Sequence, residues 1–472
     1  MNTHIPNKMA VMPMPKLLCN MGLPMILSMV LQAVYNIVDS AFVSNMKETG
    51  AEAANALTLV FPAQMLMVAF GIGTGVGMNA LVSKSLGQKD FSKAGKAAGN
   101  AFFLAGIMFL AFVLFGLFGA EPYVMSQASA ETSTQTLEMS VSYLKICCTC
   151  SFGIVIFSIA EKLLQAAGNS LYSTIAQIAG AVVNILLDPI MIYGWLGCPE
   201  LGVRGAALAT VIGQIVSAGL GIFFHFRMNK EIRNSVSYLR PDMQIIREIY
   251  QIGLPAIIAQ ALMSFMTYGL NIILVRISVP MQTAYGMYYK IQQFVLFAAF
   301  GLRDAITPVI AFNHGAGNKS RIRSGIRYGL LYTGIIMLAG TIAAECAASS
   351  FAQLFSMTGE TELLFISAMH VISLSFLFAG MNIAFQGIYQ ALDGGMESLV
   401  ISLLRQLIII FPLILFFVHI AQSQPEKNWL VWSAFPIAEG ITAIVGMILL
   451  KRIYKNKTAN MQHNMLSEPV QA

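Results

Sequence analysis

Two aspartates lie inside long apolar stretches, where a charged side chain is costly. Asp39 falls within the stretch 17–44, and Asp188 falls within 171–195. A charge near the centre of a bilayer costs about 3 kcal/mol on insertion scales, so such residues usually face a cavity and have a function. Asn36 precedes Asp39 by three residues and shares its helix face. We therefore interpret Asp39 and Asp188 as candidates for binding a proton or a small cation.

The residues around Asp188 add further oxygen ligands. Asn184 lies four residues before Asp188 and so shares its face of a helix. Pro189 has no N–H group, which leaves the carbonyl of Ile185 without its usual helical partner. A carboxylate, an amide oxygen and a freed carbonyl can together hold a small hard cation or a proton. The alternative is purely structural, a hydrogen bond between aspartate and asparagine that pairs two helices.

The composition predicts that a membrane must position these residues. The 472 residues are 57% hydrophobic and 11% charged, with a mean hydropathy of +0.70, whereas soluble domains carry about 25% charged residues. Stretches of about 20 apolar residues, each long enough to cross a bilayer, cover almost the whole chain. We predict an all-α membrane protein with about twelve transmembrane helices. They lie near 17–44, 52–82, 93–119, 137–167, 171–195, 203–227, 247–277, 283–313, 321–347, 362–391, 396–420 and 428–453.

The positive charges follow the predicted topology. Four basic residues lie in 84–96, five in 227–247, four in 319–327 and four in 451–457, while the alternate loops are acidic or neutral. This alternation is the positive-inside rule, so we expect both termini on the cytoplasmic side of the cell (inner) membrane. The formal net charge of +6 therefore indicates membrane topology and not nucleic-acid binding.

The chain contains an internal repeat. Gly22-Leu23-Pro24 recurs as Gly253-Leu254-Pro255, and five other landmarks recur 230 positions later (301 − 71). These landmarks are Gly71, Gly87, Lys89, Gly95 and Gly99, matched by Gly301, Gly317, Lys319, Gly325 and Gly329. An even number of spans in each half makes the two six-helix repeats parallel, and a duplicated membrane protein of this kind is typical of transporters.

The duplication divides the chain into predicted domains but does not extend to the acidic residues. We expect a cytoplasmic N-terminus at 1–16, an N-lobe at 17–227, a cytoplasmic linker at 228–246, a C-lobe at 247–453 and a cytoplasmic tail at 454–472. The positions that correspond to Asp39 and Asp188 are Leu270 and the region of Pro412, which carry no carboxylate. The cation chemistry is therefore predicted for the N-lobe.

Other polar residues within apolar spans are weaker candidates. Glu439, three residues after Pro436, is a candidate second functional charge, and Arg405 could satisfy helix carbonyls or repel cationic ligands. Candidates for a substrate cavity are polar residues scattered along the spans: Tyr35, Asn36, Gln260, Gln292, Gln386 and Tyr389.

The chain resembles the multidrug and toxic compound extrusion (MATE) family, in its MepA/DinF-like bacterial branch, over roughly residues 15–455. The marks of this resemblance are Pro24 and Asp39, the Asn184-x-x-x-Asp188 pair, the segment 205–210 that ends in Thr210, and the hairpin 87–90.

The resemblance implies two six-helix lobes that form a V-shaped bundle around a central cavity. It also implies antiport, with export of amphipathic, cationic compounds driven by inward flow of H⁺ or Na⁺, and hence xenobiotic export and antibiotic resistance. Asp39, Asn184 and Asp188 would form the cation site, with Thr210 as a hydroxyl partner, and Pro24 would mark the bend of the first helix. No cofactor is expected beyond the coupling ion, and one chain carries both lobes, so a monomer would suffice.

Two other function classes remain as alternatives. A flippase for a lipid-linked oligosaccharide could share the fold, but it needs basic residues in its cavity, and the charges within the N-lobe spans are mostly acidic. A membrane-embedded enzyme is disfavoured because the chain has no Asp-rich motif and no His-Glu-x-x-His. The chain also lacks a phosphate-binding Gly-x-x-x-x-Gly-Lys-Ser/Thr loop, which disfavours direct use of ATP.

Overall fold

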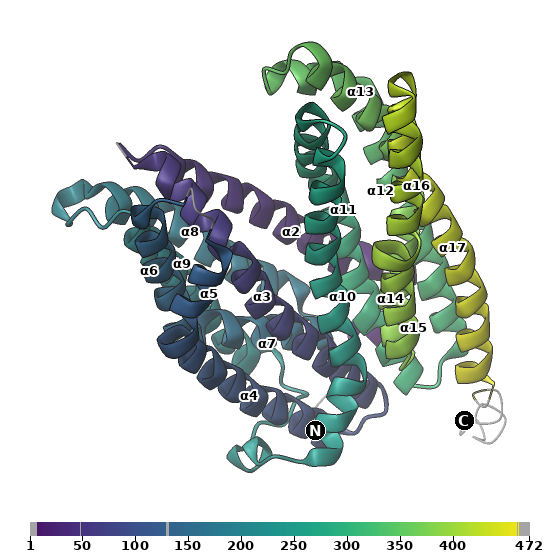
Figure 1. The fold of residues 1–472 in the computed structure, drawn as a ribbon. Coiled ribbons are helices and arrows are strands. Elements are labelled where there is room, and N and C mark those ends of the chain that lie inside the picture. Colours follow the sequence, from purple (N-terminus) through teal and green to yellow (C-terminus); the bar gives the residue numbers. More distant parts are fainter. Residues whose placement is uncertain (1–6, 48, 129–131, 460, 462–472) are drawn as a thin grey trace, which may run out of the picture. The chain divides into compact units, whose positions relative to one another are not determined.

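The computed structural model describes residues 7–47, 49–128, 132–459 and 461, and every regular element in these ranges is a helix (Figure 1). Ten helices are long and apolar enough to cross a membrane, and two bent pairs bring the number to twelve if each pair is one span. The predicted all-α membrane fold is therefore confirmed. Parts of the predicted N-terminal segment and tail lie outside the described residues.

The six spans of the N-terminal repeat follow a short helix, α1 (Lys8–Val11). They are α2 (Met14–Ser44), α3 (Gly50–Gly87), α4 with α5 (Phe91–Leu114 and Ala120–Gln127), α6 with α7 (Thr134–Thr149 and Phe152–Ala166), α8 (Ser170–Tyr193) and α9 (Val203–Met228). A π-helical turn at Phe115–Gly119 joins α4 to α5. The third span thus continues to Gln127 instead of ending at the predicted residue 119.

The six spans of the C-terminal repeat follow the same pattern. They are α10 (Met243–Val275), α11 (Val279–Gly315), α12 (Lys319–Leu354), α13 with α14 (Gly359–Ser373 and Phe376–Ala391), α15 with α16 (Gly395–Leu403 and Ile410–Ser423) and α17 (Trp429–Thr458). A π-helical turn at Leu404–Ile408 joins α15 to α16. Short 3₁₀ turns lie at Trp195–Gly197, Val236–Leu239 and Pro425–Lys427.

The fourth span of each repeat is broken in the same way. The break bends α6 against α7 by 50° and α13 against α14 by 51°. The two spans also end alike, because Gly168 and Asp393 both take a positive φ, of 86° and 61°. In both spans the next residue donates its N–H to the carbonyl of the residue five positions earlier. Asn169 donates to Leu164, and Gly394 donates to Tyr389. These matching ends, 225 residues apart (393 − 168), confirm the predicted repeat.

The hairpins after α3 and α11 show that the repeat has a local shift in register. Asp90 caps α4 by accepting from the Lys93 N–H at 2.9 Å, and Asn318 caps α12 by accepting from the Arg321 N–H at 3.1 Å. These caps are 228 residues apart (318 − 90), whereas the glycines recur at 230. The offset of 230 therefore holds for the glycines but not for the ends of these helices.

The chain divides into two compact units whose boundaries fall inside helices. One unit contains residues 1–29 and 258–472, and the other contains residues 30–257. Consequently α2 contributes its first half to the first unit and its second half to the second, and α10 does the reverse. The boundaries of the lobes predicted from the repeat, by contrast, fall between spans and not inside them.

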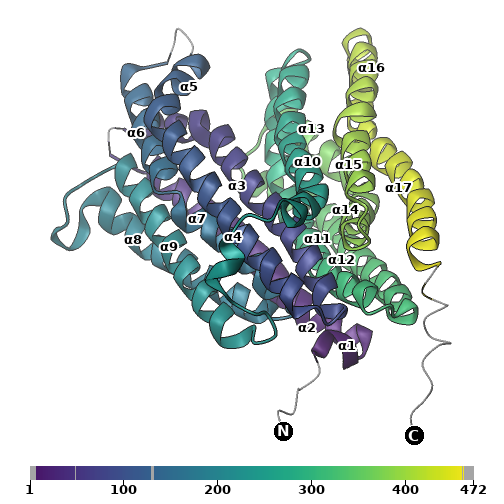
Figure 2. The same cartoon turned by 90° about the horizontal axis from the view of Figure 1, so that it is seen from below.

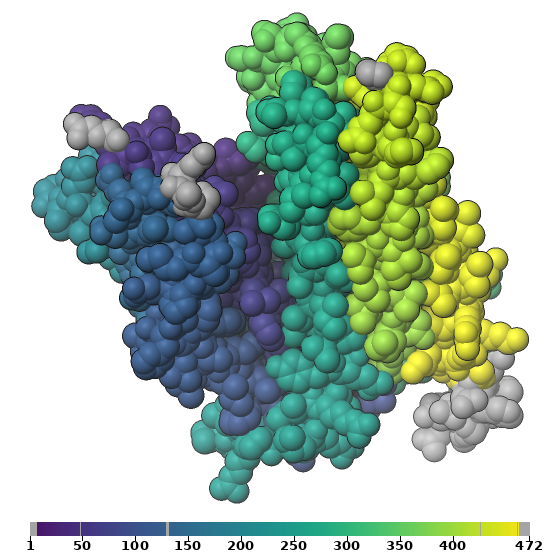
Figure 3. Space-filling view, viewed as in Figure 1, coloured from purple at the N-terminus to yellow at the C-terminus, as the bar shows by residue number. Residues whose placement is uncertain are grey.

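Each unit has its own apolar core. In the unit of residues 1–29 and 258–472, Tyr285 packs against Trp432 and Phe435, with ring centroids 6.4 and 5.7 Å apart. The helices α16 and α17 of this unit lie side by side, as the yellow-green and yellow columns of Figure 3 show. In the unit of residues 30–257, a second core gathers around Tyr143, Cys148 and Ile192.

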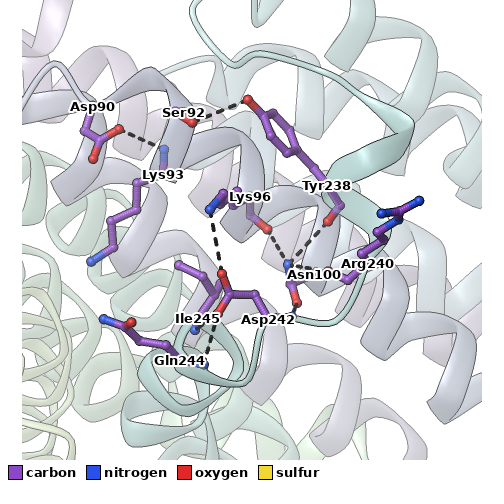
Figure 4. A network of polar contacts seen from close by, with 10 residues as sticks. All are labelled: Asp90, Ser92, Lys93, Lys96, Asn100, Tyr238, Arg240, Asp242, Gln244 and Ile245. Carbon is purple, nitrogen blue, oxygen red and sulfur yellow. Dashed lines mark hydrogen bonds and ion pairs between the residues drawn. The ribbon is translucent and has the colours of Figure 1, made fainter.

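The predicted linker 228–246 packs as a strap against α4, within the unit of residues 30–257. Asn100 holds it in place, because its Nδ2 donates to the carbonyls of Tyr238 and Arg240 at 3.3 and 3.4 Å (Figure 4). The Asn100 side-chain oxygen in turn accepts from the Asp242 N–H at 2.8 Å. Lys93 adds an ion pair with Glu248 at 2.7 Å. The strap therefore fixes the start of α10 against α4.

The helices α8 and α9 lie side by side in both views of the fold (Figure 1 and Figure 2). Glycines at Gly180 and Gly213 allow this approach. A Cβ atom on Gly180 would overlap the carbonyl oxygen of Gly213 and the hydroxyl of Ser217. A Cβ atom on Gly213 would lie 3.0 Å from the Cβ of Asn184. Small residues at helix contacts permit close packing in membranes, and here they bring Asn184 next to α9.

We predict that Gly180→Ala destabilises the protein, because the new methyl group meets the backbone of Gly213, which cannot move without separating α8 from α9. Overpacking of this kind costs about 1–3 kcal/mol. The matched control is Gly219→Ala on α9, where a Cβ meets nothing within 4 Å. That change should stabilise the helix by up to about 1 kcal/mol. Thermal unfolding of the purified variants in detergent measures both, and equal stability of the two would contradict this packing.

Candidate functional site

The predicted cation-site residues come together within the unit of residues 30–257. α2 carries Asp39, α8 carries Asn184 and Asp188, and α9 carries Thr210. All four side chains are buried, and Asp39 and Asp188 are only 8% and 0% exposed. The sequence signal of charges within apolar spans therefore located a real cluster.

Two hydrogen bonds between α2 and α8 hold the helices together on either side of the aspartates. Gln177 donates to the side-chain oxygen of Gln32 at 2.9 Å, and the Tyr193 hydroxyl donates to the carbonyl of Phe42 at 2.6 Å. Asp39 lies between Gln32 and Phe42 along α2, and Asp188 lies between Gln177 and Tyr193 along α8. This pair of contacts sets the two carboxyl groups opposite each other.

The site is a connected polar network. The Asn184 Nδ2 donates to Asp188 Oδ1 at 3.3 Å and lies 3.5 Å from Thr210 Oγ1. The Thr210 hydroxyl also interacts with the hydroxyl of Tyr35, a predicted cavity residue. The carboxyl groups of Asp39 and Asp188 are near enough to share a hydrogen bond.

Three oxygens of this network have no donor among the residues that the structure describes. They are Asp39 Oδ1, Asn184 Oδ1 and Asp188 Oδ2, and all three are buried. A buried acceptor without a partner is unfavourable, and two facing carboxylates repel each other strongly where water is excluded. A proton shared between the carboxyl groups removes the repulsion and satisfies their oxygens, and a small cation bound to all three oxygens would satisfy Asn184 as well. The site therefore has the chemistry of a cation or proton receptor.

Two prolines lie in the helices that carry the aspartates. Pro189 is buried inside α8, directly after Asp188, and its ring removes the N–H that would otherwise satisfy the Ile185 carbonyl. Pro24 lies inside α2, and the helix continues through it from Met14 to Ser44. Pro24 belongs to the part of α2 in the unit of residues 1–29 and 258–472, whereas Asp39 belongs to the part in the other unit.

Three residues near Asp39 were missed by the sequence analysis. Gln64 on α3 donates to the Tyr143 hydroxyl at 3.4 Å and lies 3.9 Å from the Cys147 sulfur, both on α6. Tyr143 and Cys147 are near enough to Asp39 for electrostatic interaction. A single glutamine or tyrosine within an apolar span follows no recurring pattern, so only its polarity inside a span could have flagged it.

Other predicted residues lie in the unit of residues 1–29 and 258–472. Gln292 on α11 lines a pocket together with Arg405 and Glu439. Glu439 accepts from the guanidinium of Arg405 at 3.0 and 2.7 Å and from Asn382 at 2.7 Å. The candidate second charge is therefore paired with a buried cation.

The remaining cavity candidates occupy different environments. Asn36 is exposed on α2, and Gln260 is half-buried on α10. Gln386 donates to the hydroxyl of Ser402 at 3.1 Å, and the Tyr389 hydroxyl donates to the carbonyl of Gly446. The last two residues therefore make hydrogen bonds between packed helices.

Comparison with known proteins gives a family and a fold. The family model MatE matches residues 24–190 and 255–415, which is one match in each repeat. A multidrug export protein MepA from Staphylococcus aureus (strain MSSA476) is 27% identical over 438 residues, covering 93% of this chain and 94% of the relative. The protein of the same name from Staphylococcus haemolyticus (strain JCSC1435) is 26% identical over 446 residues, covering 94% of this chain and 95% of the relative.

The fold is similar to that of solved transporters. A structure described as an outward-facing conformation of a multidrug resistance MATE family transporter of the MOP superfamily aligns with a TM-score of 0.89 and 22% identity. The alignment covers 97% of this chain and 100% of the chain in the solved structure. The family match, the multi-pass helical fold and the repeat agree with one another. The chain belongs to the MatE family, and it is a membrane transporter and not an enzyme.

Proposed function

We propose that the protein is a secondary active multidrug exporter, which moves amphipathic compounds out of the cell while H⁺ or Na⁺ flows inward. The observation that carries this proposal is the pair of buried carboxyl groups, Asp39 and Asp188, with three buried oxygens that have no donor. Such a site gains stability when it takes up a cation. An inward gradient of that cation can therefore supply the free energy for transport.

Coupling requires that the charge state of the site affects the part of the chain that carries cargo. α2 offers this link, because it carries Asp39 in one compact unit and continues through Pro24 into the other. When the carboxyl pair is charged, repulsion favours moving Asp39 away from Asp188. When a cation or proton is bound, the repulsion is removed and the two helices can close. We propose that α2 bends near Pro24 between these two states.

The cargo class follows from the names of the relatives and from the charges of the site. The staphylococcal relatives are multidrug export proteins, which supports small and varied organic substrates. The two acidic residues favour cationic compounds over anionic ones in the unit of residues 30–257. A flippase for lipid-linked oligosaccharides is less well supported, because it needs basic residues in its cavity and the charges within the spans of the N-terminal repeat are mostly acidic.

The topology and assembly are also proposals. We place both termini on the cytoplasmic side of the inner membrane, because the basic loops alternate with acidic or neutral ones. We propose that a monomer is the functional form, since one chain contains both repeats. We also propose that the ion gradient and not ATP drives transport.

We predict that Asp188→Asn abolishes gradient-driven efflux of ethidium from proteoliposomes, because an amide cannot take up and release a proton or pair with Na⁺ as a carboxylate does. Imposing a pH gradient and a Na⁺ gradient separately identifies the ion, since only one should drive the wild type. The matched control is Asp90→Asn, an exposed helix cap where asparagine serves as well as aspartate. The Asp90→Asn protein should pump at the wild-type rate.

Other results would contradict the proposal. Normal pumping by Asp188→Asn would make Asp188 a structural residue. Efflux of ethidium by neither gradient in the wild type would contradict a coupled multidrug exporter and favour the flippase, which transport of a fluorescent lipid-linked sugar would test.

We predict that Thr210→Val distinguishes the two ions. The hydroxyl of Thr210 lies 3.5 Å from Asn184 Nδ2 and could ligate Na⁺, whereas a proton shared by the aspartates does not need it. If Na⁺ is the coupling ion, the Na⁺ concentration for half-maximal efflux should rise about tenfold, because the site loses one oxygen ligand. If H⁺ is the ion, the pH profile should hardly change. Thr58→Val is the control, because Thr58 is exposed and its hydroxyl bonds only to its own helix.

A further inference from the structure

The unit of residues 1–29 and 258–472 contains a pocket that the proposed coupling mechanism does not use. Its walls come from α10, α11, α16, α17, the break between α13 and α14, and the π-helical turn at Leu404–Ile408. Part of the lining is apolar and aromatic, with Met263, Tyr289 and Phe300. The lining also includes the charged residues Arg405 and Glu439. A pocket of this mixed character is typical of sites for small organic ligands.

The charged pair in the pocket is buried and well organised. The side chains of Arg405 and Glu439 are 8% and 14% exposed. Both the Nε and the Nη2 of Arg405 donate to the same oxygen, Glu439 Oε1, and Asn382 donates to the other oxygen. A buried ion pair is weak evidence for stability, because the cost of removing both charges from water offsets their attraction. Its retention inside an apolar span indicates a function.

Both members of the ion pair lie where the regular α-helical hydrogen bonding is interrupted. Arg405 and Gln406 belong to the π-helical turn between α15 and α16. Turns of this kind occur frequently at functional sites. Glu439 follows Pro436 by three residues in α17, a helix whose hydrogen bonding the proline interrupts.

Two polar atoms in the pocket wall lack a partner among the described residues. They are Gln406 Oε1 and Ser375 Oγ, and their residues are only 5% and 1% exposed. Both residues line the pocket beside Arg405. Buried polar groups are normally hydrogen-bonded, so each exception in a pocket indicates a group that a ligand would satisfy. The free amide oxygen calls for a hydrogen-bond donor on that ligand.

The chemistry of the ion pair decides what charge the ligand carries. A guanidinium group stays protonated in proteins, so Arg405 keeps its charge. A cationic ligand would meet the fixed charge of Arg405, whereas a carboxylate could take the place of Glu439 on the guanidinium fork, which suits planar, bidentate carboxylate binding.

We propose that this pocket binds the anionic group of amphipathic compounds that carry a carboxylate and an aromatic body. Arg405 receives the carboxylate in place of Glu439, and Gln406 accepts from a donor on the ligand. This inference rests on the proposed function and extends its cargo to anionic and zwitterionic compounds, with recognition at a place separate from Asp39 and Asp188.

The other groups that face the pair do not compete for this role. α11 contributes the hydroxyls of Tyr288 and Tyr289, which interact electrostatically with Glu439 and Arg405. Phenols of this kind are neutral in the physiological pH range. α14 contributes the neutral Asn382, and α10 contributes methionines. A carboxylate on the ligand would therefore pair with Arg405 and not with these neutral groups.

The test measures the direct binding of dansylglycine to the purified full-length protein in detergent, with dansyl fluorescence as the readout. Its neutral amide, dansylglycinamide, is the matched ligand control. The wild type should bind dansylglycine more tightly than the amide, because only the carboxylate pairs with Arg405. Glu439→Gln should raise the affinity for dansylglycine about tenfold, since no carboxylate then competes for the guanidinium.

The double variant Arg405→Gln/Glu439→Gln removes both charges and leaves no buried charge unpaired. It should lose the preference for dansylglycine, about tenfold in affinity, and still bind the amide, which shows that the pocket is folded. The control is the double variant Lys145→Gln/Glu121→Gln, which removes an exposed ion pair outside the pocket. That control should bind both probes as the wild type does.

Several results would overturn the inference. They are equal binding of the two probes by the wild type, no binding of either probe, and unchanged preference for dansylglycine in the Arg405→Gln/Glu439→Gln protein. Because this measurement needs no ion gradient, it is independent of ethidium efflux. Failure of efflux with intact dansylglycine binding would contradict the proposed function alone, and the opposite pattern would contradict this inference alone.

Discussion

The constraint on which the structure depends is the burial of two carboxyl groups side by side, away from water. Asp39 and Asp188 are held opposite each other by contacts between α2 and α8, and neither has a basic partner in the network described around them. Such a pair is stable only when a proton or cation joins it.

The same constraint explains why packing around the site is tight. Asn184, which bonds Asp188 within α8, can approach Thr210 on α9 only because Gly180 and Gly213 allow the two helices to come together. A looser contact would admit water, which would solvate the carboxylates and weaken their demand for a cation. Small residues that make no polar contact thus control the electrostatics of the site. The helix α2, which carries Asp39, contributes residues to both compact units.

The sequence predicted the spans and the cation site for physical reasons that apply residue by residue. A charge inside an apolar stretch is costly, so Asp39 and Asp188 stood out, and a spacing of four linked Asn184 to Asp188. Other features carry no such signal. The hydrogen bonds of Gln32 with Gln177 and of Tyr193 with α2 join residues about 150 positions apart, and single polar residues within spans do not reveal their partners. Recurring glycines likewise did not report where the helices of each hairpin end.

The two repeats have similar helical folds, but the buried charged side chains of the two compact units differ. In the unit of residues 30–257, Asp39 and Asp188 have no basic partner in the network described around them. In the other unit, Glu439 has a permanent partner in Arg405, so the pair is neutral until one member is displaced. The two aspartates have no counterpart in the C-terminal repeat, because the positions that correspond to Asp39 and Asp188 carry no carboxylate. The helices of the two repeats therefore correspond to each other, whereas their buried charged residues do not.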